Sequence, residues 1–141
     1  MADIKAFLQP PVLGEEKDVL VSKRFRDEDG KPVPFTIRVI DQETNGRLLK
    51  RATKRTKMDG QIVEELDSDR YGKLLVDACV VFPNFKSVEV CEHYKTTDPL
   101  EVPGRMLNVG EYNRLVREIK IFNELTDDDN EFAQLKEEAK N

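Results

Sequence analysis

The chain has 141 residues, of which 38% are hydrophobic and 36% are charged, and its formal net charge is −5. This balance predicts one compact domain with a modest core and argues against a second domain or a protein that coats nucleic acid, since phosphate binding needs a basic surface. No apolar run approaches the roughly 20 residues of a membrane span, and the first residues lack a signal-peptide pattern, so we expect a cytoplasmic protein.

The first sixteen residues predict an arm rather than a regular element. Two prolines and a glycine within this stretch prevent a long helix or strand. The arm carries one short apolar cluster, formed by Ile4, Phe7 and Leu8. We expect residues 1–16 to dock on the rest of the domain through this cluster.

Residues 17–40 predict a β-hairpin. Apolar residues alternate over residues 19–26 and again over residues 35–39, and Gly30 between them can adopt the positive φ angle that longer hairpin loops often need. Two prolines near the start of the second segment remove ladder donors, which predicts that this strand begins at a sheet edge. The apolar face of the hairpin must then lie on a helix, because an isolated hairpin is marginal in water.

Residues 41–57 carry two conflicting signals. The Asn45-Gly46 dipeptide is typical of hairpin turns, whereas the apolar residues between positions 48 and 52 have helical spacing. We favour a helix capped by Asp41 or Thr44.

Residues 58–66 lead from this helix to the next one. They predict a loop that pins Ile62, Val63 and Leu66 to the core. A third short strand is the alternative.

A central core helix is predicted from Asp67 to Phe82. Asp67 and Ser68 supply N-cap oxygens, and Pro83 ends the helix because the residue before a proline avoids the α conformation. One face carries six residues at helical spacing: Tyr71, Leu74, Leu75, Ala78, Cys79 and Phe82. Valines off this face indicate that the helix has packing partners on more than one side.

The last third of the chain predicts further helices. Ser87 caps a short helix that runs through Tyr94, and Asp98 starts a short turn that Pro103 and Gly104 limit. Residues 109–125 form a second strong helix whose inward face holds five residues: Tyr112, Leu115, Val116, Ile119 and Phe122.

A final amphipathic helix is predicted for residues 131–140, with Phe132 and Leu135 pointing inward. The whole pattern predicts an α+β fold, in which an N-terminal β-hairpin packs on a bundle of about four to five helices.

No catalytic motif is present. His93 is the only histidine and is expected on the surface, and Cys91 two positions earlier would point to a different side of a helix, so the two cannot form a nucleophile and base. Cys79 and Cys91 lack the spacing of a zinc site and are predicted to be reduced thiols. The acidic run at residues 127–131 lacks the glycine of a calcium loop and is better explained as a helix cap. We therefore expect no enzymatic activity, no cofactor and no metal.

One short stretch is strongly basic. Residues 47–57 contain no acid and six basic residues: Arg47, Lys50, Arg51, Lys54, Arg55 and Lys57. Without these six, 17 basic residues stand against 28 acidic ones, a net charge of −11 for the remainder. A solvated helix face is the plain interpretation; the others are an electrostatic contact with an acidic protein or a second copy, or contact with nucleic acid.

Five short motifs, in this order and spacing, carry a family resemblance: SKRF at 22–25, GKP at 30–32, CVVFPNF at 79–85, GEY at 110–112 and EEAKN at 137–141. The chain resembles the XkdN-like tail assembly chaperones of PBSX-type prophages over nearly its whole length. The resemblance implies a non-enzymatic factor of phage tail morphogenesis that binds the tape measure protein, and other tail proteins are possible partners. The alternatives are a structural tail component and a nucleic-acid-binding accessory protein.

Apolar residues in excess of the core indicate where such a partner binds. Ile121 and Leu125 lie off the inward face of the 109–125 helix. Surplus apolar area on a monomer usually marks an interaction surface. We expect partner binding there, with the cluster of Ile4, Phe7 and Leu8 as the second candidate.

Overall fold

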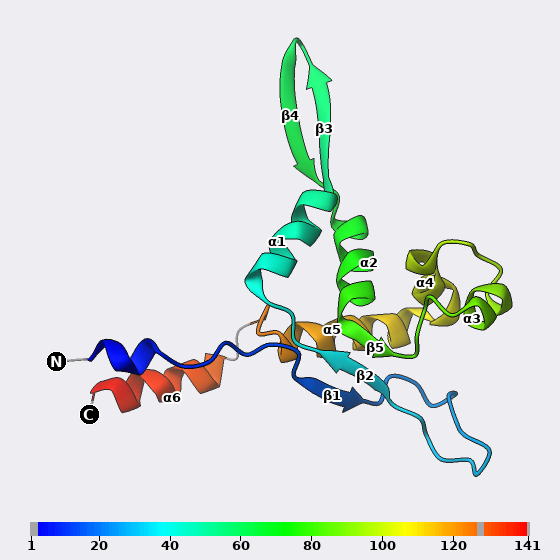
Figure 1. Ribbon diagram of the computed structural model, residues 1–141, viewed down its shortest axis with the longest axis horizontal. Helices are drawn as coiled ribbons and strands as arrows, with labels where there is room; N and C mark the ends of the chain where they lie inside the picture. Colours follow the sequence, from blue (N-terminus) through cyan, green and yellow to red (C-terminus); the bar gives the residue numbers. More distant parts are fainter. Residues whose placement is uncertain (1–2, 127–128, 141) are drawn as a thin grey trace.

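The computed structural model describes residues 3–126 and 129–140. A small antiparallel sheet packs against helices α2 (Ser68–Cys79) and α5 (Val109–Phe122), and several segments extend from this body (Figure 1). They include the hairpin of β3 (Thr53–Met58) and β4 (Gln61–Leu66), residues 3–13, the loop that precedes β2, and helix α6 (Asp129–Lys140). The α+β prediction is confirmed.

The sheet contains the predicted hairpin and one strand that was not predicted. Strand β1 (Glu16–Val19) pairs antiparallel with β2 (Phe35–Arg38), and β5 (Val80–Phe82) pairs antiparallel with the other side of β2. The first strand is thus shorter than predicted and starts earlier. The prediction that the second strand begins at a sheet edge is wrong, because β2 lies between β1 and β5. Pro32 and Pro34 precede β2, so neither needs to donate a hydrogen bond to the ladder.

The central helix α2 starts as predicted but ends three residues early. The Asp67 carboxylate caps it by accepting from the Arg70 N–H at 3.1 Å. The helix ends at Cys79 because the β-branched Val80 and Val81 favour extended backbone and the open side of β2 offers them hydrogen bonds. Phe82 therefore lies on the sheet edge, 53% exposed, and not on the helix face predicted for it.

Residues 41–66 form a helix followed by a hairpin. Helix α1 (Gln42–Arg51) is capped by Asp41, whose carboxylate accepts from the Thr44 N–H at 2.7 Å, so the predicted helix is confirmed as far as Arg51. The predicted loop at 58–66 is wrong, because Asp59 and Gly60 both take positive φ angles and close a two-residue turn between β3 and β4. The strand alternative is correct.

The hairpin holds its apolar residues away from the core. Ile62, Val63 and Leu66 are exposed, so they do not pin the segment to the body as expected. Pairing with β3 directs the chain outward from the end of α1, and the sequence pattern alone gave no sign of this direction.

Three short helical segments follow the sheet: α3 (Val88–His93), the 3-10 turn η2 (Pro99–Glu101) and α4 (Val102–Met106). Asp98 caps η2 as predicted, accepting from the Leu100 N–H at 3.0 Å. Pro103 and Gly104 were predicted to end the turn that starts at Asp98, but they lie within α4, which continues it. Pro103 is tolerated there because a proline in the first turn of a helix loses no hydrogen bond. Ser87 sits at the predicted N-cap of α3, but its side chain makes no capping hydrogen bond.

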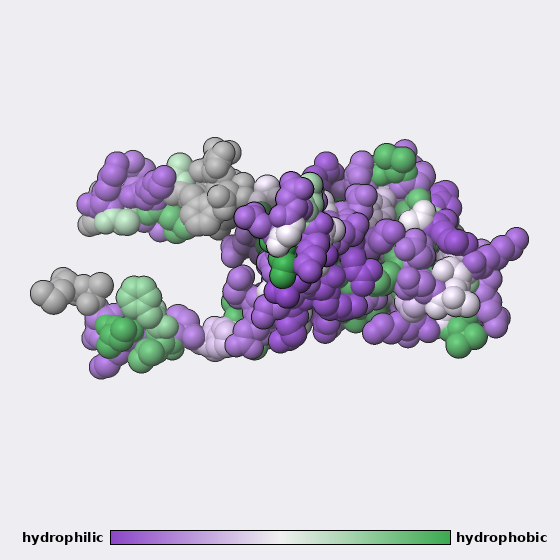
Figure 2. Space-filling model, turned by 90° about the horizontal axis from the view of Figure 1, so that it is seen from above, coloured by the Kyte–Doolittle hydropathy of each residue, from purple (hydrophilic) through white to green (hydrophobic). Residues whose placement is uncertain are grey.

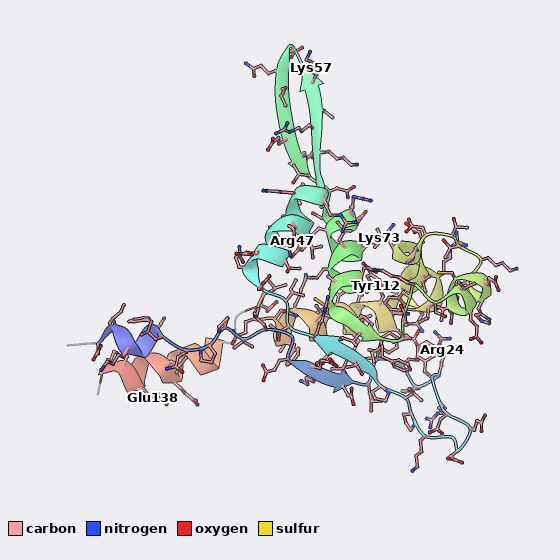
Figure 3. All side chains as sticks on the ribbon, viewed as in Figure 1. Arg24, Arg47, Lys57, Lys73, Tyr112 and Glu138 are labelled. Carbon is pink, nitrogen blue, oxygen red and sulfur yellow. The ribbon has the colours of Figure 1, made fainter. Side chains whose placement is uncertain are left out.

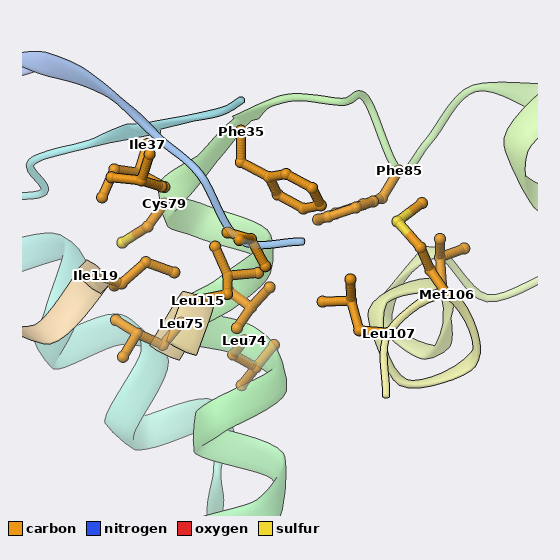
Figure 4. Packing of buried hydrophobic residues seen from close by; sticks show 14 of the residues in the cluster. Phe35, Ile37, Leu74, Leu75, Cys79, Phe85, Met106, Leu107, Leu115 and Ile119 are labelled. Atoms are coloured by element: carbon orange, nitrogen blue, oxygen red, sulfur yellow. The ribbon is translucent and has the colours of Figure 1, made fainter. Parts of the chain in front are cut away.

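The core lies where α2 and α5 cross beneath the sheet (Figure 4). Leu74, Leu75 and Cys79 of α2 and Leu115 and Ile119 of α5 are fully buried, which confirms the two predicted faces. A large apolar side chain buried in this way stabilises the fold by roughly 1.5–3 kcal/mol. Val76, off the main face of α2, is also fully buried, so that helix does pack on more than one side.

Among the described helices, none has the length and apolar character needed to cross a membrane.

Candidate partner-binding surface

The N-terminal arm, residues 3–13, leaves the body close to the end of α5. Gly14 donates to the Val39 carbonyl at 3.3 Å and Val39 donates to the Glu15 carbonyl at 2.8 Å, which anchors the root of the arm. The neighbouring Ile40 N–H donates to the side-chain oxygen of Asn123, the C-cap of α5, at 2.8 Å. The root of the arm and the end of α5 are therefore both hydrogen-bonded to residues 39–40.

The arm does not dock on the body. Its only helical turn is η1 (Ile4–Phe7), in which the Asp3 carboxylate accepts from the Lys5 N–H at 3.0 Å. The side chains of Ile4, Phe7 and Leu8 are 71%, 74% and 71% exposed. The expected docking is thus wrong for this structure, because the prolines that follow the cluster keep the chain extended and place the cluster beyond the body.

Helix α6 projects in the same direction as the arm. Leu135 is exposed and not directed inward as predicted, while the structure does not describe the side chain of Phe132, for which the same direction was predicted. Figure 2 shows the arm and α6 as two prongs with a gap between them, and apolar atoms lie along that gap on both. The two prongs offer apolar surface without a partner in the described part of the chain.

Ile121 and Leu125 lie near the base of the α6 prong. Ile121 is in the last turn of α5 and is 51% exposed, and Leu125 follows that helix and is 44% exposed. Their predicted position off the core face is confirmed by this exposure, whereas their role in binding stays a prediction. They are thus exposed apolar residues at and just beyond the end of α5, before the helix that forms one prong.

The sequence had indicated that the basic stretch forms one helix face, but in the structure it is divided between a helix and a strand. Arg47, Lys50 and Arg51 lie on α1, whereas Lys54, Arg55 and Lys57 lie on β3 (Figure 3).

Antiparallel pairing places acids beside the cations of β3, with Glu65 opposite Lys54 and Glu64 opposite Arg55. Arg55 forms an ion pair with Glu64 at 2.8 Å, and Lys54 forms one with Asp67 at 3.3 Å. The charge of this stretch is thus partly balanced by residues that follow it in the sequence.

The two cysteines and the histidine differ in burial and in hydrogen bonding. Burial raises the pKa of the Cys79 thiol to about 11, and the half-buried Cys91 thiol donates to the Phe85 carbonyl at 3.1 Å. His93 is exposed on α3. In residues 3–126 and 129–140 no group of three or more His, Cys, Asp or Glu side chains is placed to hold a metal; the acidic run proposed as a cap lies partly outside these ranges.

Sequence reasoning missed one ion pair that organises the body. Glu111 is buried, and its carboxylate accepts from Arg24 Nε at 3.0 Å and Nη2 at 2.6 Å, from the Ser22 hydroxyl, and from the Asn108 N–H at 2.9 Å. These hydrogen bonds, above all those from Arg24, lower the Glu111 pKa to about 2. The Asn108-x-x-Glu111 spacing of a capping box was the available signal for Glu111, but nothing in the sequence linked it to Arg24.

Comparison with known proteins gives consistent matches. A family model described as phage XkdN-like tail assembly chaperone protein matches residues 4–140. Two proteins of Bacillus subtilis strain 168 are similar: YqbN, 42% identical over 129 residues, and the phage-like element PBSX protein XkdN, 38% identical over 130 residues. Each alignment covers 90% of this chain and 85% of the relative. The crystal structure of YqbN aligns with a TM-score of 0.70 and 34% identity, covering 87% of this chain and 97% of that one.

Proposed function

The chain belongs to the family of phage XkdN-like tail assembly chaperones, and we propose that it acts by binding the tape measure protein during tail assembly. In this proposal it is a non-enzymatic factor that works in the cytoplasm of the bacterial host. It holds helical segments of the tape measure protein against the apolar surface between the two prongs.

The exposed apolar residues of the prongs are the observation that supports this proposal. Monomeric proteins rarely leave contiguous apolar surface uncovered unless a partner binds there. Ile4, Phe7 and Leu8 are each more than two-thirds exposed, and Ile121 and Leu125 add apolar area near the base of α6. An amphipathic helix placed between the prongs would cover both groups at once.

The body is suited to present this surface. The hydrogen bonds from residues 39 and 40 to the root of the arm and to Asn123 fix the root of the arm and the end of α5 beside the buried sheet. A binding surface positioned by a packed scaffold loses less conformational entropy on binding than one on a free chain.

Ile121→Asp tests the proposal. The side chain is half exposed, so a charge there should leave the free protein folded, whereas burying it without a partner in a complex is costly. We expect an unchanged circular dichroism spectrum and melting temperature, loss of co-purification with the tape measure protein, and accumulation of that protein in the insoluble fraction.

Val88→Asp is the matched control, since Val88 is also exposed but lies on α3, away from the prongs. The Val88→Asp variant should still co-purify with the tape measure protein. If Ile121→Asp folds and still co-purifies with the tape measure protein, the binding surface is not at the base of the prongs.

A further inference from the structure

A second apolar site lies at the opposite end of the sheet from the prongs. It is a pocket of about 420 Å³ bounded by the loop before β2, the end of β5, α3 and α4. Most of its lining is aromatic or aliphatic: Phe25, Val33, Pro34, Phe35, Phe82, Pro83, Val90, Tyr94 and Met106. Among the described residues of the lining, Glu89 is the charged one, and His93 and the hydroxyl of Tyr94 add polar groups.

Two arginines form hydrogen bonds between the segments that line this pocket. Arg24 binds the Glu111 carboxylate and also donates from Nη2 to the Met106 carbonyl at 2.9 Å, which joins the loop that carries Phe25 to α4 and α5 (Figure 3). Arg105 of α4 donates from Nη1 to the carbonyls of Tyr94 and Lys95 at 3.2 and 2.8 Å, which holds the end of α3. The pocket is therefore formed before anything binds, as is usual for binding sites.

The N-terminal arm has the complementary chemistry. Its cluster of Ile4, Phe7 and Leu8 is exposed, and Lys5, the only cation among residues 3–13, lies within the same turn. An apolar side chain from this turn can enter the pocket while the Lys5 ammonium faces the Glu89 carboxylate. The other charge of the arm, Asp3, caps the Lys5 N–H.

Position favours the arm of another molecule over the protein's own arm. The root of the arm is bonded to Val39, beyond one end of β2, whereas the pocket includes Pro34 and Phe35 at the other end. The arm also leads away from the pocket (Figure 1). We propose that the pocket receives the N-terminal arm of a second copy of this chain, with Phe7 as the anchor and Lys5 beside Glu89, in a reciprocal dimer.

This dimer goes beyond the proposed function, because it forms in the absence of the tape measure protein or any other partner protein. It covers the apolar cluster of each arm when no partner protein is present, and two-fold symmetry fills both pockets and ends the association at two chains. A partner protein that binds the same arm would compete with the second copy of the chain for it.

A charge-exchange experiment on the purified protein, with no tail protein present, tests the dimer. Sedimentation equilibrium over a range of protein concentrations should show a monomer–dimer equilibrium for the wild type. Lys5→Glu and Glu89→Lys should each weaken the dimer by about threefold to tenfold, since like charges then meet. The double variant should recover most of the wild-type affinity.

Glu92→Lys is the matched control, because Glu92 is also an exposed acid on α3 but does not line the pocket. It should dimerise like the wild type. Phe7→Asp should abolish the dimer, and its melting temperature should equal that of the wild type at a concentration low enough for the wild type to be monomeric, since Phe7 is exposed in the monomer.

Three results would overturn the proposal: a wild type that stays monomeric, a dimer that Phe7→Asp leaves intact, or a double variant no better than the single ones. None of them bears on tape measure binding, which Ile121→Asp tests in a different assay.

Discussion

Glu111 joins segments that are far apart in the chain, and this makes the stability of the body depend on pH. Its pKa is lowered from an ordinary 4.5 to about 2 in the folded protein, chiefly by hydrogen bonds from Arg24 and also by the Ser22 hydroxyl and the Asn108 N–H. A carboxyl with a depressed folded-state pKa contributes its full stabilisation above the unfolded-state pKa and loses it as pH falls through the folded-state value. The contribution of Glu111 is therefore complete above about pH 5 and is lost between about 4.5 and 2.

Glu111→Gln should show this dependence directly. At pH 7 the variant should melt at a lower temperature than the wild type, because Arg24 loses its ionic partner while the neutral amide fills the same space. The difference between the two melting temperatures should shrink as pH falls toward 2. Thermal melts at pH 7, 5 and 3 measure it, and a difference that stays constant with pH would show that the ion pair does not contribute in this way.

Cys79 provides a second test at the scale of one residue. Burial among the core residues of α2 and α5 raises its pKa to about 11, so little thiolate exists at neutral pH and reagents have no access to it. We expect one fast-reacting thiol per folded chain, Cys91, and two after unfolding in guanidinium chloride. Titration with a disulfide reagent such as Ellman's reagent counts them, and rapid labelling of Cys79 in the native protein would contradict the burial described here.

At the scale of elements, the β3–β4 hairpin places acidic partners beside part of the basic stretch and so reduces its net positive charge. A helix over residues 41–57 would have carried all six cations, whereas the observed strand pairs Arg55 with Glu64 and brings Lys54 to Asp67. Arg47, Lys50 and Arg51 remain on α1. We propose that this α1 face makes an electrostatic contact with an acidic protein surface and does not bind nucleic acid.

Duplex DNA binding is the measurement that separates these two functions. Non-specific DNA-binding proteins have dissociation constants of roughly 10⁻⁴–10⁻⁶ M at physiological salt. We expect no binding tighter than this range at about 150 mM salt, because the acids of β4 reduce the positive potential of the hairpin. A clearly tighter complex that Arg51→Glu weakens would favour the nucleic-acid interpretation.

At the scale of the whole molecule, a packed body separates two apolar sites. The sheet, α2 and α5 form the core, the prongs extend from one end of β2, and the aromatic pocket lies at the other end. Both sites depend on hydrogen bonds from the body: those of residues 39, 40 and 123 at the prongs, and those of Arg24 and Arg105 at the pocket. In the two proposals made above, the same arm binds either the tape measure protein or a second copy of the chain.

Stability and binding are therefore separable by mutation. Ile119 is fully buried, so Ile119→Ala should lower the free energy of unfolding by about 2–5 kcal/mol and says nothing about a partner. Ile121, two residues later, is half exposed and is the position that we propose contacts the partner. The sequence distinguished these two neighbours correctly because helical periodicity assigns them to different faces.

The sequence by itself determined the elements whose signals are local. Periodicity identified the buried faces of α2 and α5, and side-chain caps located the starts of α1, α2 and η2, because each cap joins residues that are two or three positions apart. It also indicated that Ile121 and Leu125 were apolar residues in excess of the core, whereas it wrongly expected Ile4, Phe7 and Leu8 to dock on the body.

Only the tertiary structure decided the features that depend on distant partners. The strand at Val80–Phe82 exists because β2 offers an open side, and the Ser22 hydroxyl reaches Glu111 across 89 positions of sequence. The aromatic pocket, and the hydrogen bonds of residues 39–40 to the root of the arm and to Asn123, likewise join segments that no local pattern relates. Such contacts form only once the chain has folded, since their free energy comes from packing and hydrogen bonds between elements rather than from the propensities within each one.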